Sequence, residues 1–139
     1  MDKKKMILVS HGKLAEGMLH SVQMIVGENS DLSAMGMLPG EHYQPMVDTI
    51  EQELINHPDT QYLVVADLLG GSVCNGMTML TGYPNMKLVA GMNMGLVIAL
   101  LLSPGALSDE AIDDAIAQTV SMNHRVVLEM KTGDKEDFF

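Results

Sequence analysis

Hydrophobic residues along this chain fall into two alternating patterns. Short continuous apolar runs, typical of strands buried on both faces, alternate with segments in which apolar residues recur every three or four positions, typical of amphipathic helices. The runs predict strands at 6–10, 32–38, 62–67, 87–91 and 125–130. The periodic segments predict helices at 13–27, 46–56, 73–81, 92–102 and 109–123.

Strands that alternate with helices predict an α/β fold with an open, mostly parallel sheet and helices on both faces. We expect right-handed crossovers and the flavodoxin-like strand order 2-1-3-4. The chain has 139 residues, enough for one sizeable core, and no long linker or internal repeat interrupts it. We therefore expect a single domain over residues 1–131, followed by a mobile acidic tail at 132–139.

Local signals refine the boundaries of these elements. Ser72 and Ser108 stand just before predicted helices, where a serine side chain commonly caps the first turn. Residues 39–45 contain two prolines and a glycine, which predict a turn before the next helix. The three lysines at 3–5 precede the first apolar run, and we expect them to form a solvated lead-in to the strand.

The charge balance of the chain is strongly acidic, with a net charge of −10. Seven lysines and one arginine form no basic stripe, so we expect no binding of nucleic acid. An acidic surface instead favours electrostatic encounter with a basic protein partner.

Cysteine, leader and membrane signals are sparse. The single cysteine, Cys74, excludes an intrachain disulfide and a cysteine-rich metal site. No signal peptide fits the N-terminus, and the longest apolar run, 96–102, is far shorter than the ~20 residues that span a bilayer. We therefore expect a cytoplasmic protein. The 14 methionines are explained either by filling of the core or by an adaptable contact surface.

The strand order predicts where a ligand binds. In a doubly wound sheet the site lies beyond the carboxyl ends of the strands, where the order reverses, here between the first and third strands. The first strand ends in Ser10, His11 and Gly12, and the third leads into the segment DLLGGSVCN, residues 67–75. We expect these two segments to face each other across one crevice.

The residues at this crevice suit a phosphoryl group carried on histidine. His11 can act as a nucleophile near neutral pH, and Asp67 can accept a hydrogen bond from one ring nitrogen and fix the tautomer. Gly70, Gly71 and Ser72 precede a helix, so their backbone N–H groups can form an anion site. Each of these residues also has a purely structural explanation, as a core histidine, a loop cap, turn glycines or a helix cap. Their joint placement favours the functional interpretation.

Other chemistries lack necessary residues. The chain contains neither G-x-x-x-x-G-K-[ST] nor G-x-G-x-x-G, so it has no ordinary nucleotide-binding loop. The GGSVC segment does not match G-x-S-x-G, and one arginine cannot build the cationic clamp of a histidine phosphatase. His11 and Asp67 would supply only two ligands to a metal ion. We expect neither a metal nor another cofactor.

Four segments resemble the enzyme IIA domain of the mannose-type sugar phosphotransferase system (PTS). These are ILVSHGKLAEGML, the PGE turn at 39–41, ADLLGGSVCN and KLVAGMNMGLVIALL, and the resemblance extends from residue 6 to about 130. It implies that His11 accepts a phosphoryl group from phospho-HPr and passes it to a histidine of enzyme IIB. Sugar uptake by the membrane subunits IIC and IID would then depend on this chain only indirectly.

The resemblance also implies roles for the residues around His11. Asp67 is the partner of the ring, the loop with Gly70, Gly71 and Ser72 receives the phosphoryl oxygens, and a supporting role falls to Ser10, Gly12 and Asn75. Members of this family are homodimers that exchange their last strand, which makes 125–130 an antiparallel edge strand in the partner's sheet.

The chain also departs from the family pattern. Val73 replaces a frequent proline, and the chain continues only into a short acidic tail, so we expect IIB to be a separate polypeptide. Two alternatives stay open beside the phosphocarrier. A small metal-binding enzyme of the chelatase type would bind a divalent metal through His11, and a regulatory module would bind a partner without taking up phosphoryl groups.

Overall fold

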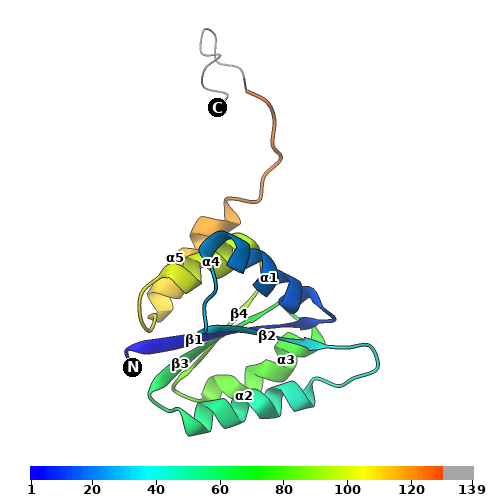
Figure 1. The fold of residues 1–139 in the computed structure, drawn as a ribbon, viewed down its shortest axis with the longest axis vertical. Helices are drawn as coiled ribbons and strands as arrows, with labels where there is room; N and C mark the ends of the chain where they lie inside the picture. Colours follow the sequence, from blue (N-terminus) through cyan, green and yellow to red (C-terminus); the bar gives the residue numbers. More distant parts are fainter. Residues whose placement is uncertain (130–139) are drawn as a thin grey trace.

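The computed structural model describes residues 1–129, which fold around a sheet whose strand order is β2-β1-β3-β4 (Figure 1). All three strand pairings are parallel, which confirms the predicted fold class and order. The strands are β1 (Lys3–His11), β2 (Leu32–Met37), β3 (Thr60–Ala66) and β4 (Met86–Ala90). The helices are α1 (Leu14–Val26), α2 (Gln44–Asn56), α3 (Ser72–Thr78), the 3-10 helix η1 (Met79–Gly82), α4 (Met94–Leu102) and α5 (Asp109–Val120).

Helices cover both faces of the sheet. Figure 1 shows α1, α4 and α5 on one face and α2 and α3 on the other. Side chains alternate between the faces along each strand, so Met6 and Leu8 of β1 pack in the first layer while Ile7 and Val9 pack in the second. Because both layers are apolar, the strand sequences form continuous hydrophobic runs rather than alternating ones.

The expectation for the N-terminal lysines is wrong. Lys3, Lys4 and Lys5 belong to β1 and pair with residues 60–62 of β3, so they are not a solvated lead-in. Lys4 and Lys5 are half-buried. A lysine can occupy such a position because its aliphatic stem packs on the sheet while the ammonium group reaches solvent.

Helix boundaries follow capping residues that the sequence only partly revealed. Ser108 caps α5 as expected, and its hydroxyl accepts a hydrogen bond from Ala111 N at 3.1 Å. Asn93 caps α4 in the same way, so this helix starts two residues later than predicted. The predicted cap at Ser72 is wrong, because Gly71 is the N-cap of α3 and Ser72 is the first helical residue.

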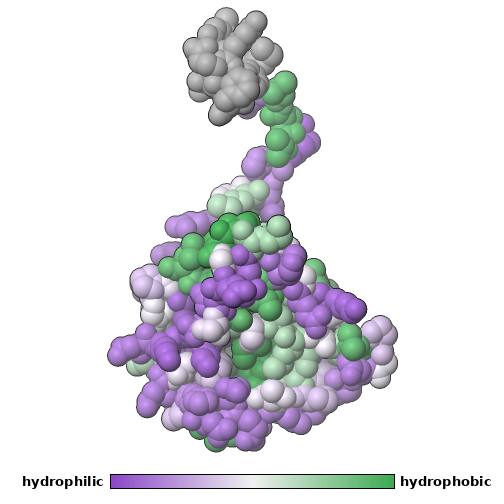
Figure 2. Space-filling view, viewed as in Figure 1, coloured by the Kyte–Doolittle hydropathy of each residue, from purple (hydrophilic) through white to green (hydrophobic). Residues whose placement is uncertain are grey.

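Residues 121–129, the described part of the chain beyond α5, pair with no strand. Residues 123–129 lead away from the body, and their apolar side chains are exposed (Figures 1 and 2), with Val126 81% and Leu128 77% accessible. The predicted strand at 125–130 is therefore absent from residues 125–129 of this chain. Its exchange with a second copy stays a prediction, and the predicted tail at 132–139 lies outside the described residues. Within residues 1–129, the structure contains no helix of the length and apolarity needed to cross a bilayer.

Candidate functional site

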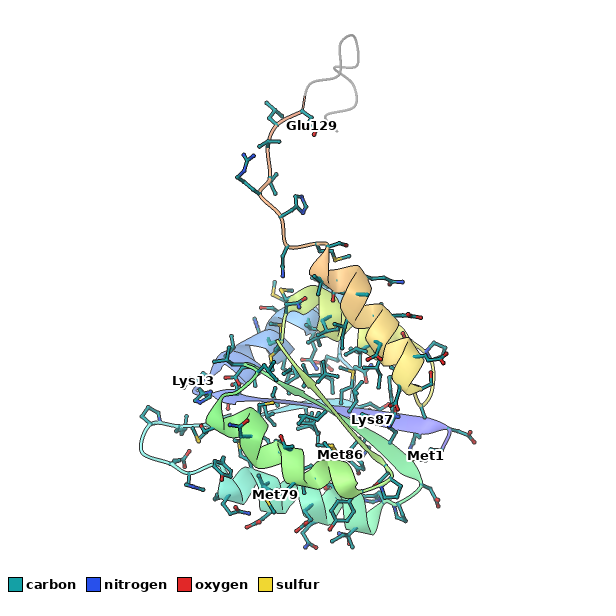
Figure 3. The ribbon with its side chains drawn as sticks, turned by 180° about the vertical axis from the view of Figure 1, so that it is seen from behind. Met1, Lys13, Met79, Met86, Lys87 and Glu129 are labelled. Atoms are coloured by element: carbon teal, nitrogen blue, oxygen red, sulfur yellow. The ribbon has the colours of Figure 1, made fainter. Side chains whose placement is uncertain are left out.

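His11 and Asp67 meet at the carboxyl edge of the sheet. His11 is the last residue of β1, and Asp67 directly follows β3, the neighbouring parallel strand. The backbone fixes this arrangement, because Asp67 N donates to Val9 O at 3.1 Å. In Figure 3 this edge lies near Lys13, at the end of the sheet opposite Met1. The two segments therefore meet at one edge of the sheet, as expected.

One oxygen of Asp67 holds His11 at two points. Asp67 Oδ2 lies 2.8 Å from Nδ1 of the imidazole and accepts a second hydrogen bond, of 2.9 Å, from the backbone N–H of His11. The Asp67 side chain is 8% exposed, whereas that of His11 is 46% exposed. The carboxylate is thus a buried anchor, and the imidazole is accessible from solvent.

The electrostatics of Asp67 determine the tautomer of His11. Burial of the Asp67 carboxyl raises its pKa, but hydrogen bonds from the backbone and ring of His11, the charge of His11 and the Leu68 N–H outweigh burial. The net result is a pKa below the usual value. An ionised carboxylate only accepts hydrogen bonds, so in the neutral tautomer that this contact favours Nδ1 carries the proton and Nε2 has the lone pair.

Ser72 stands at the other ring nitrogen. Its Oγ lies 3.2 Å from His11 Nε2. The hydroxyl faces the imidazole because Ser72 begins α3 rather than capping it. The first backbone bond across this turn runs from Asn75 N to Gly71 O, so the N–H groups of residues 72–74 precede the intrahelical ladder. The Ser72 hydroxyl thus lies beside Nε2, at the end of α3 whose first N–H groups have no partner in the helix.

Glycines allow the loop of residues 67–72 to approach the ring. Gly70 has a φ of +81°, a left-handed conformation that favours glycine. A Cβ at Gly71 would lie 3.2 Å from His11 Cε1 and 3.3 Å from Leu68 O, so a side chain there would press on the imidazole. Asn75 donates from Nδ2 to Gly70 O at 3.2 Å, which ties the loop to α3 without touching His11.

Ser10 and Gly12 support the site indirectly. Ser10 is fully buried, and its Oγ accepts a hydrogen bond of 2.8 Å from Ala15 N in the first turn of α1. Gly12 has a φ of +57° and donates from its N–H to Met37 O at 2.7 Å. Gly36 contributes a contact that the sequence analysis missed, because a Cβ there would overlap the Gly12 carbonyl. The only sequence signal was a lone glycine inside a strand.

Exposed leucines surround this edge, a second feature that sequence reasoning missed. Leu14, Leu38, Leu68 and Leu69 are 52%, 44%, 61% and 80% exposed, respectively. They lie just after the ends of β1, β2 and β3, and we call them the leucine rim. The signal available in the sequence was the placement of large apolar residues directly after predicted strands.

The described residues contain no evident metal centre. Among residues 1–129, no three His, Cys, Asp or Glu side chains come close enough to hold a metal ion. The remaining histidines, 20, 42, 57 and 124, are all exposed. The structure thus gives the chelatase alternative no ligand set beyond His11 and Asp67.

Comparisons of sequence and structure find known proteins that are similar to this chain. The family model described as the PTS system fructose IIA component matches residues 5–120. The sorbose-specific EIIA component of Klebsiella pneumoniae is 28% identical over 133 residues, which cover 95% of this chain and 97% of that protein. The mannose-specific EIIAB component of Escherichia coli K12 is 23% identical, and the chain spans 39% of its length. Among solved structures, the mannose/sorbose specific IIA subunit of the phosphotransferase system from Enterococcus faecalis superposes with a TM-score of 0.82 and 34% identity, covering 94% of this chain and 99% of that chain.

Proposed function

Because the chain belongs to the mannose-type enzyme IIA family of the sugar phosphotransferase system, we propose that it carries phosphoryl groups on His11. In this proposal His11 accepts the group from phospho-HPr and donates it to a histidine of enzyme IIB, in support of sugar uptake. The observation that carries the proposal is the 2.8 Å contact between Asp67 Oδ2 and His11 Nδ1, with Nε2 left beside Ser72.

The transfer is a substitution at phosphorus. The Nε2 lone pair of His11 attacks the phosphoryl group of the donor, the donor's N–P bond breaks, and its electron pair returns to the donor imidazole. The His11 ring gains positive character as the new N–P bond forms. Asp67 stabilises that charge through Nδ1–H, as a carboxylate does beside a catalytic imidazole. The same steps in reverse, with the IIB histidine as nucleophile, unload the carrier.

Ser72 and the backbone supply the contacts for the phosphoryl oxygens. The Ser72 hydroxyl lies beside Nε2, and Ser72 is the first residue of α3, whose initial N–H groups would supply the backbone contacts. The chain's single arginine, Arg125, belongs to the C-terminal segment and not to this edge. Neutral hydrogen-bond donors stabilise the phosphoryl group without the strong ion pair that an arginine would form, which suits a carrier that must release the group.

The surroundings of His11 fit protein partners. The leucine rim offers exposed apolar contact area after the ends of three strands, and such clusters commonly mark protein interaction sites. The net charge of −10 favours a partner with a basic surface. Both properties support exchange with carrier proteins rather than with a small molecule. We place this exchange in the cytoplasm, with IIC and IID reached only through IIB.

We further propose that the working form is a homodimer in which residues 125–130 join the partner's sheet. The exposure of Val126, Val127 and Leu128, and the lack of strand pairing there in the single chain, support this assembly. Sedimentation equilibrium should give twice the mass of the chain. A monomer at micromolar concentration would contradict the proposal.

Phosphorylation in a reconstituted relay tests the carrier function. The protein is incubated with phosphoenolpyruvate, enzyme I and HPr, and its intact mass is then measured before and after acid treatment. We expect one acid-labile phosphoryl group on the wild-type chain and on His57→Ala, and none on His11→Ala. Uptake by His11→Ala equal to that of the wild type would refute the assignment.

A further inference from the structure

We propose that a methionine-lined hollow beside His11 is an anchor pocket for a bulky apolar side chain of the protein that exchanges the phosphoryl group. The inference rests on the proposed function and specifies how the partner docks. The hollow has a volume of about 210 Å³ and lies between β2 and the first half of α2. Met35, Met37 and Met46 line it together with Pro45, and the exposed Glu41 and His42 lie at its solvent side.

The hollow and the imidazole share one face of the sheet. Met37 of β2 is the direct neighbour of His11 in the strand register. Ile7 and Val9 of β1 face the α2 layer, so the alternation places His11 on that face as well. Met35 and Met37 pack against the same layer. Because adjacent strands lie about 4.8 Å apart, the hollow begins one strand away from the reacting group.

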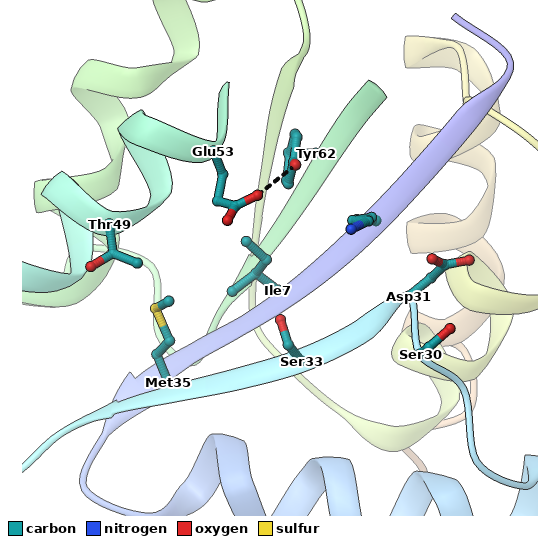
Figure 4. Close-up of a pocket in the computed structure, with 9 residues that line it drawn as sticks. Ile7, Ser30, Asp31, Ser33, Met35, Thr49, Glu53 and Tyr62 are labelled. Carbon is teal, nitrogen blue, oxygen red and sulfur yellow. Dashed lines mark hydrogen bonds between the residues drawn. The ribbon is translucent and has the colours of Figure 1, made fainter. Parts of the chain in front are cut away.

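The groove under β2 has two halves that differ in the charged residues and methionines that line them. A second hollow, also of about 210 Å³, shares Met35 and Thr49 with the first and continues toward the amino ends of the strands. Figure 4 shows its charged and hydroxyl side chains, including Asp31 and the Glu53 carboxylate, which accepts a hydrogen bond from the Tyr62 hydroxyl. Three methionines line the half next to His11, whereas only Met35 lines the other half. The half richer in methionine is therefore the one that a partner reaches while its histidine faces His11.

Methionine walls suit this task physically. Met35 and Met37 are only partly buried, so core filling does not account fully for them. Unbranched thioether side chains reshape around different apolar groups, and such surfaces occur where one site binds more than one protein. A phosphocarrier must receive a donor and an acceptor at the same histidine. One adaptable pocket can seat an apolar side chain from either.

The charge around the hollow defines the rest of the partner. Glu41 lies at its solvent side, and the whole chain carries a net charge of −10. The fitting partner therefore presents a bulky apolar side chain close to its own phosphorylatable histidine, on a basic surface. A single buried anchor of this kind commonly dominates the binding energy of a small interface.

The effect of a substitution on partner docking can be separated from its effect on phosphoryl transfer by comparing a protein donor with a small-molecule donor. Phosphorylation of Met35→Ala and Met37→Ala by phospho-HPr is measured beside phosphorylation by phosphoramidate, which needs no docking surface. We expect kcat/KM with phospho-HPr to fall about tenfold, through KM, while the rate with phosphoramidate is unchanged. Met35→Leu should keep most of the activity. Met79→Ala, which removes an 82% exposed side chain outside the hollow, is the matched control.

The outcomes distinguish the anchor from its alternatives. Unchanged kcat/KM with phospho-HPr in both alanine variants would overturn the anchor while leaving the carrier function intact. An equal loss with both donors would also overturn it, because the methionines would then act on the His11 site itself. If neither donor phosphorylates His11 in the wild-type chain, the proposed function fails as well.

Discussion

Within residues 1–129, two histidines lie beside a carboxylate, and only one of them is held by it. His11 and Asp67 approach to 2.8 Å, whereas His57 and Glu53 stay 3.7 Å apart at the end of α2. Asp67 is 8% exposed and bonds His11 twice, while Glu53 is 44% exposed and accepts the Tyr62 hydroxyl instead. An imidazole and a carboxylate thus form a rigid pair at the ends of adjacent strands and a loose pair on a helix surface.

The difference shows that geometry fixed by the backbone, rather than proximity of charge, makes a site. The β1–β3 ladder runs to Val9 and Ala66, and the hydrogen bond from Asp67 N to Val9 O continues it, so the backbone holds Asp67 beside the end of β1. His57 and Glu53 are neighbours only through helical spacing, and exposed pairs of that kind contribute little. The predictions below test whether the rigid pair alone supports phosphoryl transfer.

Replacement of the buried carboxylate should have the largest effect. Asp67→Asn puts an amide beside Nδ1 that can donate as well as accept, so the ring can adopt the wrong tautomer. We expect phosphoryl uptake to slow by on the order of a hundredfold or more. Glu53→Gln should leave the rate unchanged. The rate of phosphoryl transfer from phospho-HPr is measured for both variants. Equal rates would mean that the His11–Asp67 pair contributes no more to transfer than the His57–Glu53 pair.

A side chain at Gly71 should have the next largest effect. The added Cβ of Gly71→Ala would lie 3.2 Å from His11 Cε1, so the imidazole must shift by a few tenths of an ångström. Misplacement by a full ångström can cost about a hundredfold, and we expect a loss of some tens of fold here. Gly82→Ala, where a Cβ meets nothing within 4 Å, is the control. The phosphorylation rates of the two variants give the comparison, and a loss in Gly82→Ala would point to a general effect on folding.

Two serines at helix starts should separate catalysis from stability. Ser72→Ala removes the hydroxyl at Nε2, and we expect about a tenfold loss of rate with little change in stability. Ser108→Ala removes the cap of α5, and we expect about 1 kcal/mol of destabilisation with no loss of rate. Urea unfolding and transfer assays on both variants measure the two effects. The reverse pattern would mean that Ser72 is a structural cap after all.

The smallest effect should be a pH dependence of stability. The pKa of Asp67 is lower in the folded chain than in the unfolded one, so its contribution is complete above the unfolded value of about 4 and is lost as pH falls through the folded value. The difference in free energy of unfolding between the wild type and Asp67→Asn should therefore shrink with acidification below about pH 4. Urea titrations across this range measure it, and a difference independent of pH would exclude the ionised pair.

The sequence predicted the strand order because strands and helices alternate along it. It predicted the contact between His11 and Asp67 because that order determines which strand ends are adjacent. Parallel strands place their carboxyl ends at one edge, and the rule for the switch point then selects two segments without reference to residue type. The direction of the Ser72 hydroxyl was not predictable in this way. It depends on Gly71 taking the cap position, which the local sequence does not determine.

Other features depend on contacts between distant segments. The lysines at 3–5 are strand residues because β3 continues alongside them, and only the pairing partner sets that boundary. The leucine rim combines residues that follow three different strands, so no single stretch of sequence displays it. The methionine-lined hollow likewise needs β2 and α2 together. Composition indicated abundant methionine but gave no position for it.

Nitrogen NMR of His11 before and after phosphorylation tests the central claim most directly. In the proposed mechanism, Asp67 keeps the proton on Nδ1 of His11 and leaves Nε2 as the nucleophile. Long-range proton–nitrogen spectra should therefore show the Nδ1–H tautomer in the free chain and phosphorus bonded to Nε2 after transfer from phospho-HPr. Phosphorus bonded to Nδ1, or a free chain in the opposite tautomer, would contradict it.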